Sequence, residues 1–255
     1  MSPDGRGELG RATIVPMPDP TAALQAVRTS TADLLKGLEE HRWSDDELRA
    51  PSRCAGWTRG HVLTHLARNA DGIAATLAGA LRGEVVPRYP GGGRGRDQEI
   101  EDGAPRPALA LLADVSESAE RLDRVFGAVQ EAGRWDARTD GGLTAADWPA
   151  RRLREVEIHR VDLAGDYGPD RWPPLLVAEL LPGVMTSLAE RVATGVHVVV
   201  DAAGSVAPEP AGQEWTVGDG AVEVRGPDWA VLAWATGRGA AATGLGEAPG
   251  LAPWR

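Results

Sequence analysis

Cysteine is nearly absent from the sequence, since Cys54 is the only one among 255 residues. A disulfide within the chain is therefore impossible. Long apolar runs are missing too, because no stretch reaches the roughly 18 residues that a membrane-spanning helix needs. The N-terminal segment MSPDGRGELGRATIVPMPDP carries acids and prolines where a secretory signal peptide has an apolar core. We therefore expect a cytoplasmic protein without a membrane partner.

Positive charge is in short supply as well. Lysine and arginine total 27 against 37 aspartates and glutamates, which gives a net charge of −10. A nucleic-acid-binding protein needs a basic surface to meet phosphates, so this class is excluded. Phenylalanine occurs once and tyrosine twice, whereas tryptophan occurs nine times. The indole N–H needs a hydrogen-bond partner, which fits a wet cavity or a domain interface, although ordinary packing accounts for most of the tryptophans.

The residues that are present predict a mainly helical chain with material for one or two domains, because 42% of them are hydrophobic. We expect residues 1–19 to form a flexible arm. Leu24, Val27 and Leu34 recur near one helical face and indicate the first helix. Further helices are predicted from a Thr58 N-cap to about Gly83, over 108–132, from a Thr144 N-cap through Gly165, and over 173–193 with a bend near Pro182.

The stretch over 83–107, GEVVPRYPGGGRGRDQEIEDGAPRP, is too long and too rich in glycine for a simple connection. Such segments often act as lids or binding loops, and we expect one here. The pattern changes at Gly195, where VHVVVDAAG and EWTVGDGAVEVRG predict strands, with a Gly-Asp-Gly turn inside the second stretch. PDWAVLAWATGRG then predicts a short helix. The fold class is therefore α+β, with a helical bundle over 20–194 and a small α+β domain over 195–255.

One predicted helix carries two polar faces, whereas a surface helix needs only one. Wound at about 100° per residue, RRLREVEIHRVDLAG places Glu155, His159 and Asp162 in one stripe between apolar neighbours. A buried carboxylate has to be paired or bound to a metal. Arg151 and Arg152 lie near the stripe and offer such a pairing, and Asp162 can simply accept a hydrogen bond from His159. A solvated pair four residues apart is the third explanation.

The second candidate half of a site lies in GWTRGHVLTHLARNADG. His61 and His65 lie one turn apart on one side of this predicted helix, and His65 falls where the apolar stripe ends. A single histidine there is more often a hydrogen-bonded core residue than a ligand. Metal sites in helical bundles are built from side chains on facing helices, so either histidine is a candidate beside the pair Glu155 and His159. Glu157 points away from that pair and is no candidate.

Four stretches of the sequence carry a resemblance to a known family: GWTRGHVLTHLARNADG, YPGGGRGRDQEIEDGA, WPARRLREVEIHRVDL and VRGPDWAVLAWATGRG. Through them the sequence resembles the mycothiol-dependent maleylpyruvate isomerases. Those proteins belong to the larger DinB-like group of metal-binding four-helix bundles, and the resemblance covers nearly the whole chain after the arm. It implies a DinB-like bundle that holds zinc, or another divalent metal, through His65, Glu155 and His159. Three such ligands leave one position open for water or substrate. His61 then has a supporting role beside the ligands.

The resemblance also implies mycothiol, the sugar-linked cysteine thiol of actinobacteria, as cofactor or cosubstrate. In that chemistry a zinc-bound thiolate adds to the cis double bond of maleylpyruvate or a related unsaturated keto acid. The new single bond rotates, and elimination of the thiol leaves the trans isomer. The expected partners are a small-molecule substrate and a low-molecular-weight thiol, and we expect the chain to be a monomer or a weak dimer.

Arginine side chains suit a substrate with two carboxylates and an enolate. Arg238, in ATGRG, resembles the family's C-terminal arginine that faces the active site, which implies a catalytic and cofactor-binding role. Arg82 is a further candidate for cofactor binding. Arg94 and Arg96 are candidate anchors too, although a solvated surface arginine is the commoner explanation for all three. Cys54 has no base fixed beside it in the sequence, so we expect it to be structural or incidental.

Two other functions stay open. The same zinc and thiol chemistry serves mycothiol S-transferases, in which the thiolate attacks an electrophile and is not returned. Alternatively, the protein binds a metal or a ligand without catalysis, which a fourth protein ligand closing the metal site would favour. Only His61 offers such a ligand in the sequence.

Overall fold

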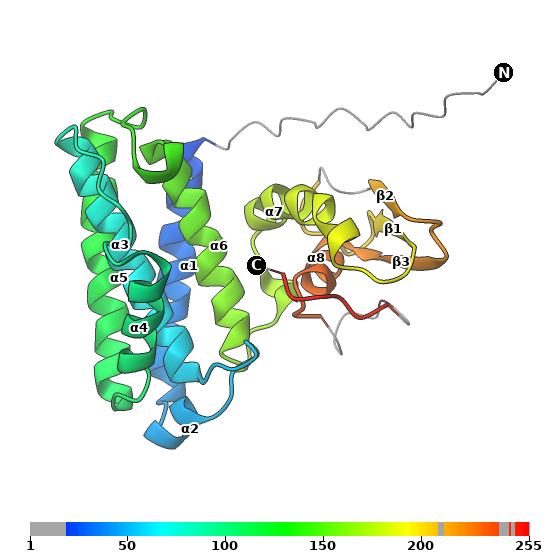
Figure 1. Ribbon diagram of the computed structural model, residues 1–255, viewed down its shortest axis with the longest axis horizontal. Coiled ribbons are helices and arrows are strands. Elements are labelled where there is room, and N and C mark those ends of the chain that lie inside the picture. The colour runs from blue at the N-terminus through cyan, green and yellow to red at the C-terminus, as the bar shows by residue number, and fades with distance from the viewer. Residues whose placement is uncertain (1–18, 209–211, 240–244, 246–247, 255) are drawn as a thin grey trace.

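The computed structural model of the protein describes residues 19–208, 212–239, 245 and 248–254. They form a helical bundle followed by a small sheet with helices, so the predicted α+β fold class is confirmed (Figure 1). The predicted flexible arm, residues 1–19, lies outside the described residues except for Asp19. Of the helices that the structure describes, none is long and apolar enough to cross a membrane.

Four long helices build the bundle within the described residues: α1 (Pro20–His41), α3 (Arg59–Leu81), α5 (Ala108–Glu131) and α6 (Trp148–Asp162). Helix α3 packs against α5, and α1 packs against α6 (Figure 1). The shorter helices α2 (Asp45–Arg49) and α4 (Gly92–Gly103) lie in connections. The predicted cap at Thr58 is confirmed, because its hydroxyl accepts from the His61 N–H while the His61 ring accepts from the Thr58 N–H.

Apolar side chains of α3 occupy the centre of the bundle. Leu66, Ile73 and Leu77 are each at most 1% exposed. Full burial of a side chain of this size contributes about 1.5–3 kcal/mol to stability. The core continues without interruption into the C-terminal region, since Leu77 belongs to the same cluster as Leu181 and Val198.

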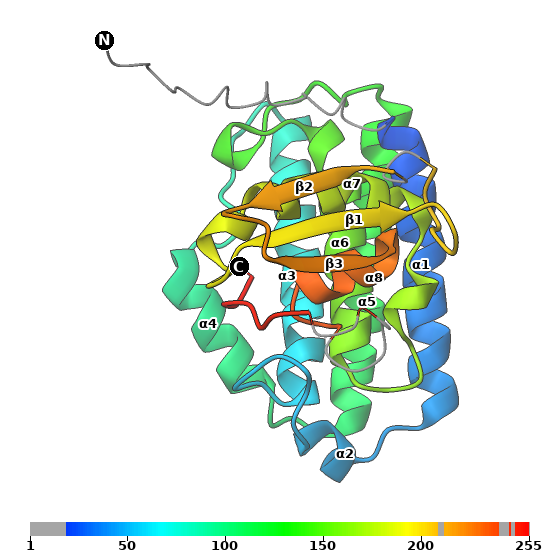
Figure 2. The same ribbon diagram turned by 90° about the vertical axis from the view of Figure 1, so that its right-hand side faces the viewer.

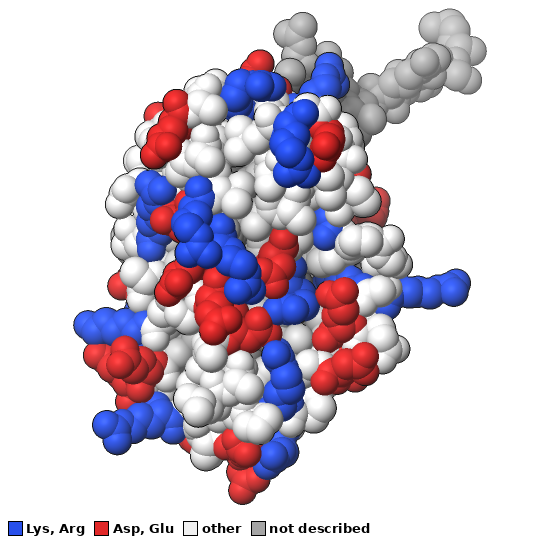
Figure 3. Space-filling model, turned by 90° about the vertical axis from the view of Figure 1, so that its left-hand side faces the viewer, with Lys and Arg blue, Asp and Glu red and all other residues white. Residues whose placement is uncertain are grey.

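Ion pairs join α3 to α5 on the outer face of the bundle. Arg121 Nη2 lies 2.8 Å from Asp71 Oδ1, and Arg68 Nη2 lies 2.5 Å from Asp114 Oδ1. On the face at the left of Figure 1, basic and acidic side chains alternate (Figure 3). The Arg121–Asp71 pair is largely exposed, and a pair of that kind contributes about 0–1 kcal/mol, whereas the Arg68–Asp114 pair is half-buried.

The predicted loop over 83–107 contains a helix, α4, so that expectation is wrong in part. Glycines and acidic residues give α4 a weak helical signal, and the only residue that it buries is Ile100. Its place depends on tertiary packing: a Cβ atom at Gly103 would lie 2.5 Å from the Thr64 side chain. Gly103 therefore lets the end of α4 approach α3 closely.

Glycines on α3 also let the segment before α4 lie flat against that helix. A Cβ atom at Gly72 would come within 2.7 Å of the Arg88 carbonyl oxygen, and one at Gly79 would overlap the Val86 side chain. The Thr76 hydroxyl, on the same face, donates to the Val86 carbonyl at 3.1 Å. This close approach fixes the path of the chain on which Arg88 is carried.

The C-terminal region contains α7 (Pro174–Thr186), β1 (Val196–Asp201), β2 (Glu214–Val217), β3 (Val222–Pro227) and α8 (Asp228–Ala235). The strand order is β2-β1-β3, with β1 antiparallel to β2 and parallel to β3 (Figure 2). The Gly-Asp-Gly turn joins β2 to β3, but these strands do not pair, because β1 lies between them. The turn crosses the start of β1 beside Gly195, where a Cβ atom would overlap Asp219.

Helix α7 continues through Pro182 to Thr186, and the bend expected there stays a prediction. It packs against α8 and α6 and lies beside the sheet in Figure 1. The domain boundary at Gly195 is likewise still a prediction.

The Thr144 cap starts a short 3₁₀ turn that leads directly into α6.

Candidate metal centre

Helices α3 and α6 bring the three predicted ligands together. His65 Nε2 lies 2.8 Å from Glu155 Oε2, and His159 Nε2 lies 3.6 Å from the same oxygen. One ligand atom from each residue lies within 4.8 Å of the others. We call His65, Glu155 and His159 the metal group. The facing arrangement of the two helices is the one that the helical pattern predicted, and metal binding by the group stays a prediction.

The electrostatics of the metal group suit a cation. Burial alone would raise the pKa of Glu155, but the hydrogen bonds and charges of the two imidazoles outweigh it and hold that pKa well below its ordinary value. Burial and the charge of His159 lower the pKa of His65 to about 4. A carboxylate and a neutral imidazole therefore face one another, and a divalent ion can take the place of a proton shared with His159.

Asp162 fixes the orientation of His159. Burial lowers the pKa of His159, but its hydrogen bonds, of which the one it donates to Asp162 has the largest effect, outweigh burial and raise the pKa well above its ordinary value. His159 Nδ1 lies 2.9 Å from Asp162 Oδ2, which leaves Nε2 facing Glu155. An imidazole held by a carboxylate in this way is the usual support of a metal-binding histidine.

Arg238 lies beside this contact and binds both oxygens of Asp162 through one edge of its guanidinium, the edge formed by Nε and Nη2. Its Nε lies 3.0 Å from Asp162 Oδ1 and its Nη2 lies 2.7 Å from Oδ2. The third donor, Nη1, binds the Thr236 carbonyl at 2.8 Å. Arg238 is thus near the metal group, as expected, but its contacts are with the carboxylate that holds His159.

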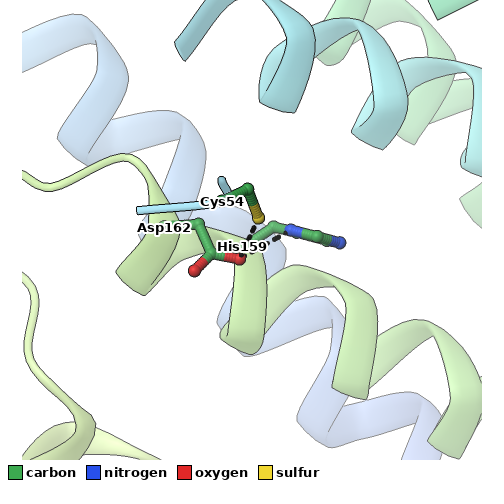
Figure 4. A group of neighbouring side chains, drawn as sticks. All are labelled: Cys54, His159 and Asp162. Atoms are coloured by element: carbon green, nitrogen blue, oxygen red, sulfur yellow. Dashed lines mark hydrogen bonds and ion pairs between the residues drawn. The ribbon is translucent and has the colours of Figure 1, made fainter. Parts of the chain in front are cut away.

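Cys54 lies closer to the metal group than the sequence indicated. Its sulfur lies 3.1 Å from Asp162 Oδ2, and Figure 4 shows both side chains beside the His159 ring. Cys54, His159 and Asp162 also satisfy the spacing of a metal site. Arg238 already neutralises Asp162, however, and its Nη2 lies 3.9 Å from the sulfur. A cation is better accommodated on the other side of His159, by the metal group.

Two residues that the sequence analysis ranked low or did not select lie at the metal group. Arg96, from α4, donates through Nη2 to His65 Nδ1 at 3.1 Å. The Trp57 ring lies 5.5 Å from the His65 ring and 6.4 Å from the His159 ring, measured between centroids. Trp57 stands in the quoted GWTRG stretch, but its direction depends on the turn before α3, which helical periodicity does not describe.

The remaining candidates lie away from the metal group. Arg82 ends α3 and binds Glu84 at 2.7 Å, so the structure does not bring it to the group. Arg94 is exposed. His61 caps α3, and its free nitrogen lies 3.3 Å from Glu101, so it does not offer the fourth ligand. Its role in support of the ligands stays a prediction.

Arg151 and Arg152 were the arginines expected to pair with the buried carboxylate, but among the described residues neither forms an ion pair with Glu155. Arg152 is buried and donates to the Leu66 carbonyl and to Asn69 Oδ1, both at 2.9 Å. Burial lowers the pKa of Arg152 to about 10. The neighbour of Glu155 on the helix, Arg154, lies 3.5 Å from Glu155 Oε1 instead.

Comparison with known proteins adds the family. Residues 24–164 match the model of the mycothiol maleylpyruvate isomerase N-terminal domain. The fold resembles a crystal structure of the mycothiol-dependent maleylpyruvate isomerase, and one of a mutant of it. Each has a TM-score of 0.77 and 24% sequence identity, over 92% of this chain and 97% of that one. No curated protein matches the sequence.

Proposed function

The chain belongs to the mycothiol maleylpyruvate isomerase family, and on that premise we propose that it is a zinc- and mycothiol-dependent cis-trans isomerase. Its substrate in this proposal is maleylpyruvate or a related unsaturated keto acid. The observation that carries the proposal is the convergence of His65, Glu155 and His159, two nitrogens and one oxygen, on one point between α3 and α6.

The donor set fits zinc. Two imidazole nitrogens and a carboxylate oxygen are ligands of catalytic zinc sites, which keep a fourth position open. Among the described residues, no further histidine, cysteine or acidic side chain joins the metal group. Zinc bound there would lower the pKa of a thiol that reached the open position.

The chain's own residues provide the setting for that thiol. Asp162 keeps the proton of His159 on Nδ1 and so keeps Nε2 available. The carboxylate of Glu155 lowers the net positive charge of the site. The Trp57 ring lies next to both imidazole rings and gives the site an aromatic border. Cys54 contacts Asp162, so the reacting thiol has to come from a separate molecule.

The reaction needs no net change in atoms. A thiolate adds to the cis double bond, the resulting single bond rotates, and elimination returns the thiol and the trans isomer. The negative charge passes from sulfur to the enolate of the substrate and back. Positive side chains near the metal group are suited to hold this charge and the carboxylates of the substrate.

The test uses the purified full-length chain with measured zinc content. Maleylpyruvate should be isomerised when mycothiol is added, and not by the protein alone. Glutathione should replace mycothiol poorly, because its peptide arms differ in shape and charge from a sugar-inositol. Stable conjugation of an electrophile to mycothiol without isomerisation would instead support an S-transferase. The absence of any zinc-dependent effect of thiol on these substrates would overturn the enzyme proposal in favour of a binding protein.

A further inference from the structure

Three arginines lie along the first turns of α6, next to Glu155: Arg151 and Arg154 on the helix itself, and Arg88 against the ring of Trp148, here called the arginine cluster. Arg154 Nη2 lies 3.5 Å from Glu155 Oε1, and Arg151 lies on α6 one turn before Glu155. Burial first, and then the charges of Arg154 and Arg88, lower the pKa of Arg151. Arg151 remains accessible to solvent even so. The spacing of Trp148, Arg151 and Arg154 on α6, with Arg88 against Trp148, therefore gathers positive charge along this part of the helix, and a ligand can reach Arg151.

Aromatic rings hold Arg88 in place without neutralising it. Its guanidinium carbon lies 4.9 Å from the Tyr89 ring centroid and 5.6 Å from that of Trp148. The close approach of this segment to Gly72 fixes its backbone. Within the described part of the chain, neither Arg88 nor Arg151 has a side-chain hydrogen bond or an ion pair. Two positive charges therefore face this region without a bound carboxylate.

Glu179 lies on α7, a helix that packs against α6, which carries Arg151 and Arg154. Burial raises the pKa of Glu179 to about 7, although the charges of Arg151 and Arg154 oppose the rise. Among the described residues, Glu179 forms no ion pair with either arginine. The protein thus places one carboxyl group near the cluster but does not engage it. An incoming carboxylate would compete with Glu179 for the same positive charge.

We propose that Arg88, Arg151 and Arg154 form a carboxylate-binding site next to the metal group, and that Glu179 weakens the affinity of this site. Guanidinium groups bind carboxylates through paired, charge-assisted hydrogen bonds. A carboxylate held by Arg154 would lie next to Glu155 of the metal group, which Arg154 contacts at 3.5 Å. The identification of the ligand as a small unsaturated dicarboxylate rests on the proposed function, whereas the carboxylate site itself rests on the arginines.

Other arginines near the metal group are less suited to this task. Arg238 places its Nε and Nη2 on the two oxygens of Asp162, so its charge is already paired with a carboxylate. Arg96 donates to His65 and lies 2.8 Å from Asp97. In the arginine cluster, by contrast, only Arg154 contacts a carboxylate of the described residues, that of Glu155.

The test measures binding of maleate to the full-length protein by calorimetry, with zinc and again after its removal by a chelator. Arg88→Gln and Arg151→Gln should each weaken maleate binding about tenfold to a hundredfold, as the loss of a charge-assisted contact predicts. Glu179→Gln should strengthen it severalfold. Arg124→Gln, on the exposed surface of α5, is the matched control and should leave binding unchanged. Zinc content and circular dichroism verify that each variant is folded.

Equal maleate affinity in the wild type, Arg88→Gln and Arg151→Gln would overturn the carboxylate site. So would weaker binding in Glu179→Gln, or a comparable loss in Arg124→Gln. Acetate serves as the singly charged probe, and it should depend on the same arginines with lower affinity. The outcome is separable from that of the proposed function. Maleate binding that depends on the cluster, without thiol-dependent turnover, would leave the site standing and reject the isomerase.

Discussion

Two glutamates on α6 lie only two residues apart and meet opposite surroundings. Glu155 faces α3 between two imidazoles, which hold its pKa well below the ordinary value. Glu157 faces α1 and Tyr167, and burial raises its pKa although hydrogen bonds from Ser30 and Tyr167 oppose the rise. The difference shows that burial alone does not decide whether a carboxyl group is charged. Cationic or metal partners favour the charged form, whereas hydroxyl groups here leave the effect of burial dominant.

The space around the two glutamates differs as well. A groove of about 1340 Å³ opens on the Glu157 side, lined by α1 and by the segment after α6. In this groove the Tyr167 hydroxyl donates to Glu157, and the Arg160 guanidinium stacks on the Tyr167 ring at 3.8 Å. The groove does not include the metal group, whose donors converge between α3 and α6, so the size of a groove does not point to the candidate metal centre.

The largest difference between the two glutamates should appear in zinc affinity when each is replaced by glutamine, which removes its charge. We expect Glu155→Gln to weaken zinc binding by at least about a hundredfold, because an anionic ligand becomes a neutral amide. Glu157→Gln should retain zinc with wild-type affinity. Competition with a chromogenic chelator measures both. Zinc loss of equal size in the two variants would mean that the fold, and not the ligand set, had been damaged.

The support of His159 should give the next largest effect. In Asp162→Asn the amide holds the imidazole less firmly, and we expect zinc affinity to fall about tenfold to a hundredfold. Asp166→Asn, just beyond α6, is the control and should keep the wild-type affinity. If Asp162→Asn binds zinc as tightly as the wild type, the orientation of His159 does not depend on this hydrogen bond.

The pH dependence of stability should reveal Glu157. Because its pKa is raised in the folded state, its favourable contribution is complete below the ordinary value of 4.5 and is lost as the pH rises through the folded value. Glu157→Gln should remove this loss and flatten the curve above pH 4.5. Urea unfolding across this range measures it. An unchanged slope would show that Glu157 does not titrate differently on folding.

The smallest effect is expected at Arg96. Its hydrogen bond to Nδ1 leaves the proton of His65 on Nε2, the nitrogen that faces Glu155. Arg96→Gln removes a positive charge and the strongest donor at Nδ1, so zinc should bind about threefold to tenfold more tightly. The same chelator competition detects the change. Weaker binding in this variant would show that Arg96 supports the metal group instead of opposing it.

Local sequence signals predicted much of this arrangement. Periodicity located the long helices and the stripe that carries Glu155 and His159, and the residue type of Thr58 indicated the cap. The resemblance selected His65 over His61, and the structure brings His65 to the other two residues. These predictions succeed because helix registry follows from a fixed rotation per residue.

The parts that local signals missed depend on contacts between distant segments. Helix α4 buries little, so its sequence lacks an apolar stripe, and Arg96 is placed only by the packing of that helix. Cys54 reaches Asp162 because the turn before α3 meets the end of α6, where the Arg53 N–H donates to the Asp162 carbonyl at 2.9 Å. In the sheet, the short connection between β2 and β3 is typical of a hairpin, so the sequence did not indicate that β1 lies between these two strands.

Anomalous scattering at the zinc edge, from crystals of the zinc-loaded protein, tests the central claim most directly. We predict a single strong peak within about 2.0–2.2 Å of His65 Nε2, Glu155 and His159 Nε2. A peak between Cys54, His159 Nδ1 and Asp162, or no ordered peak at these helices, would contradict the account.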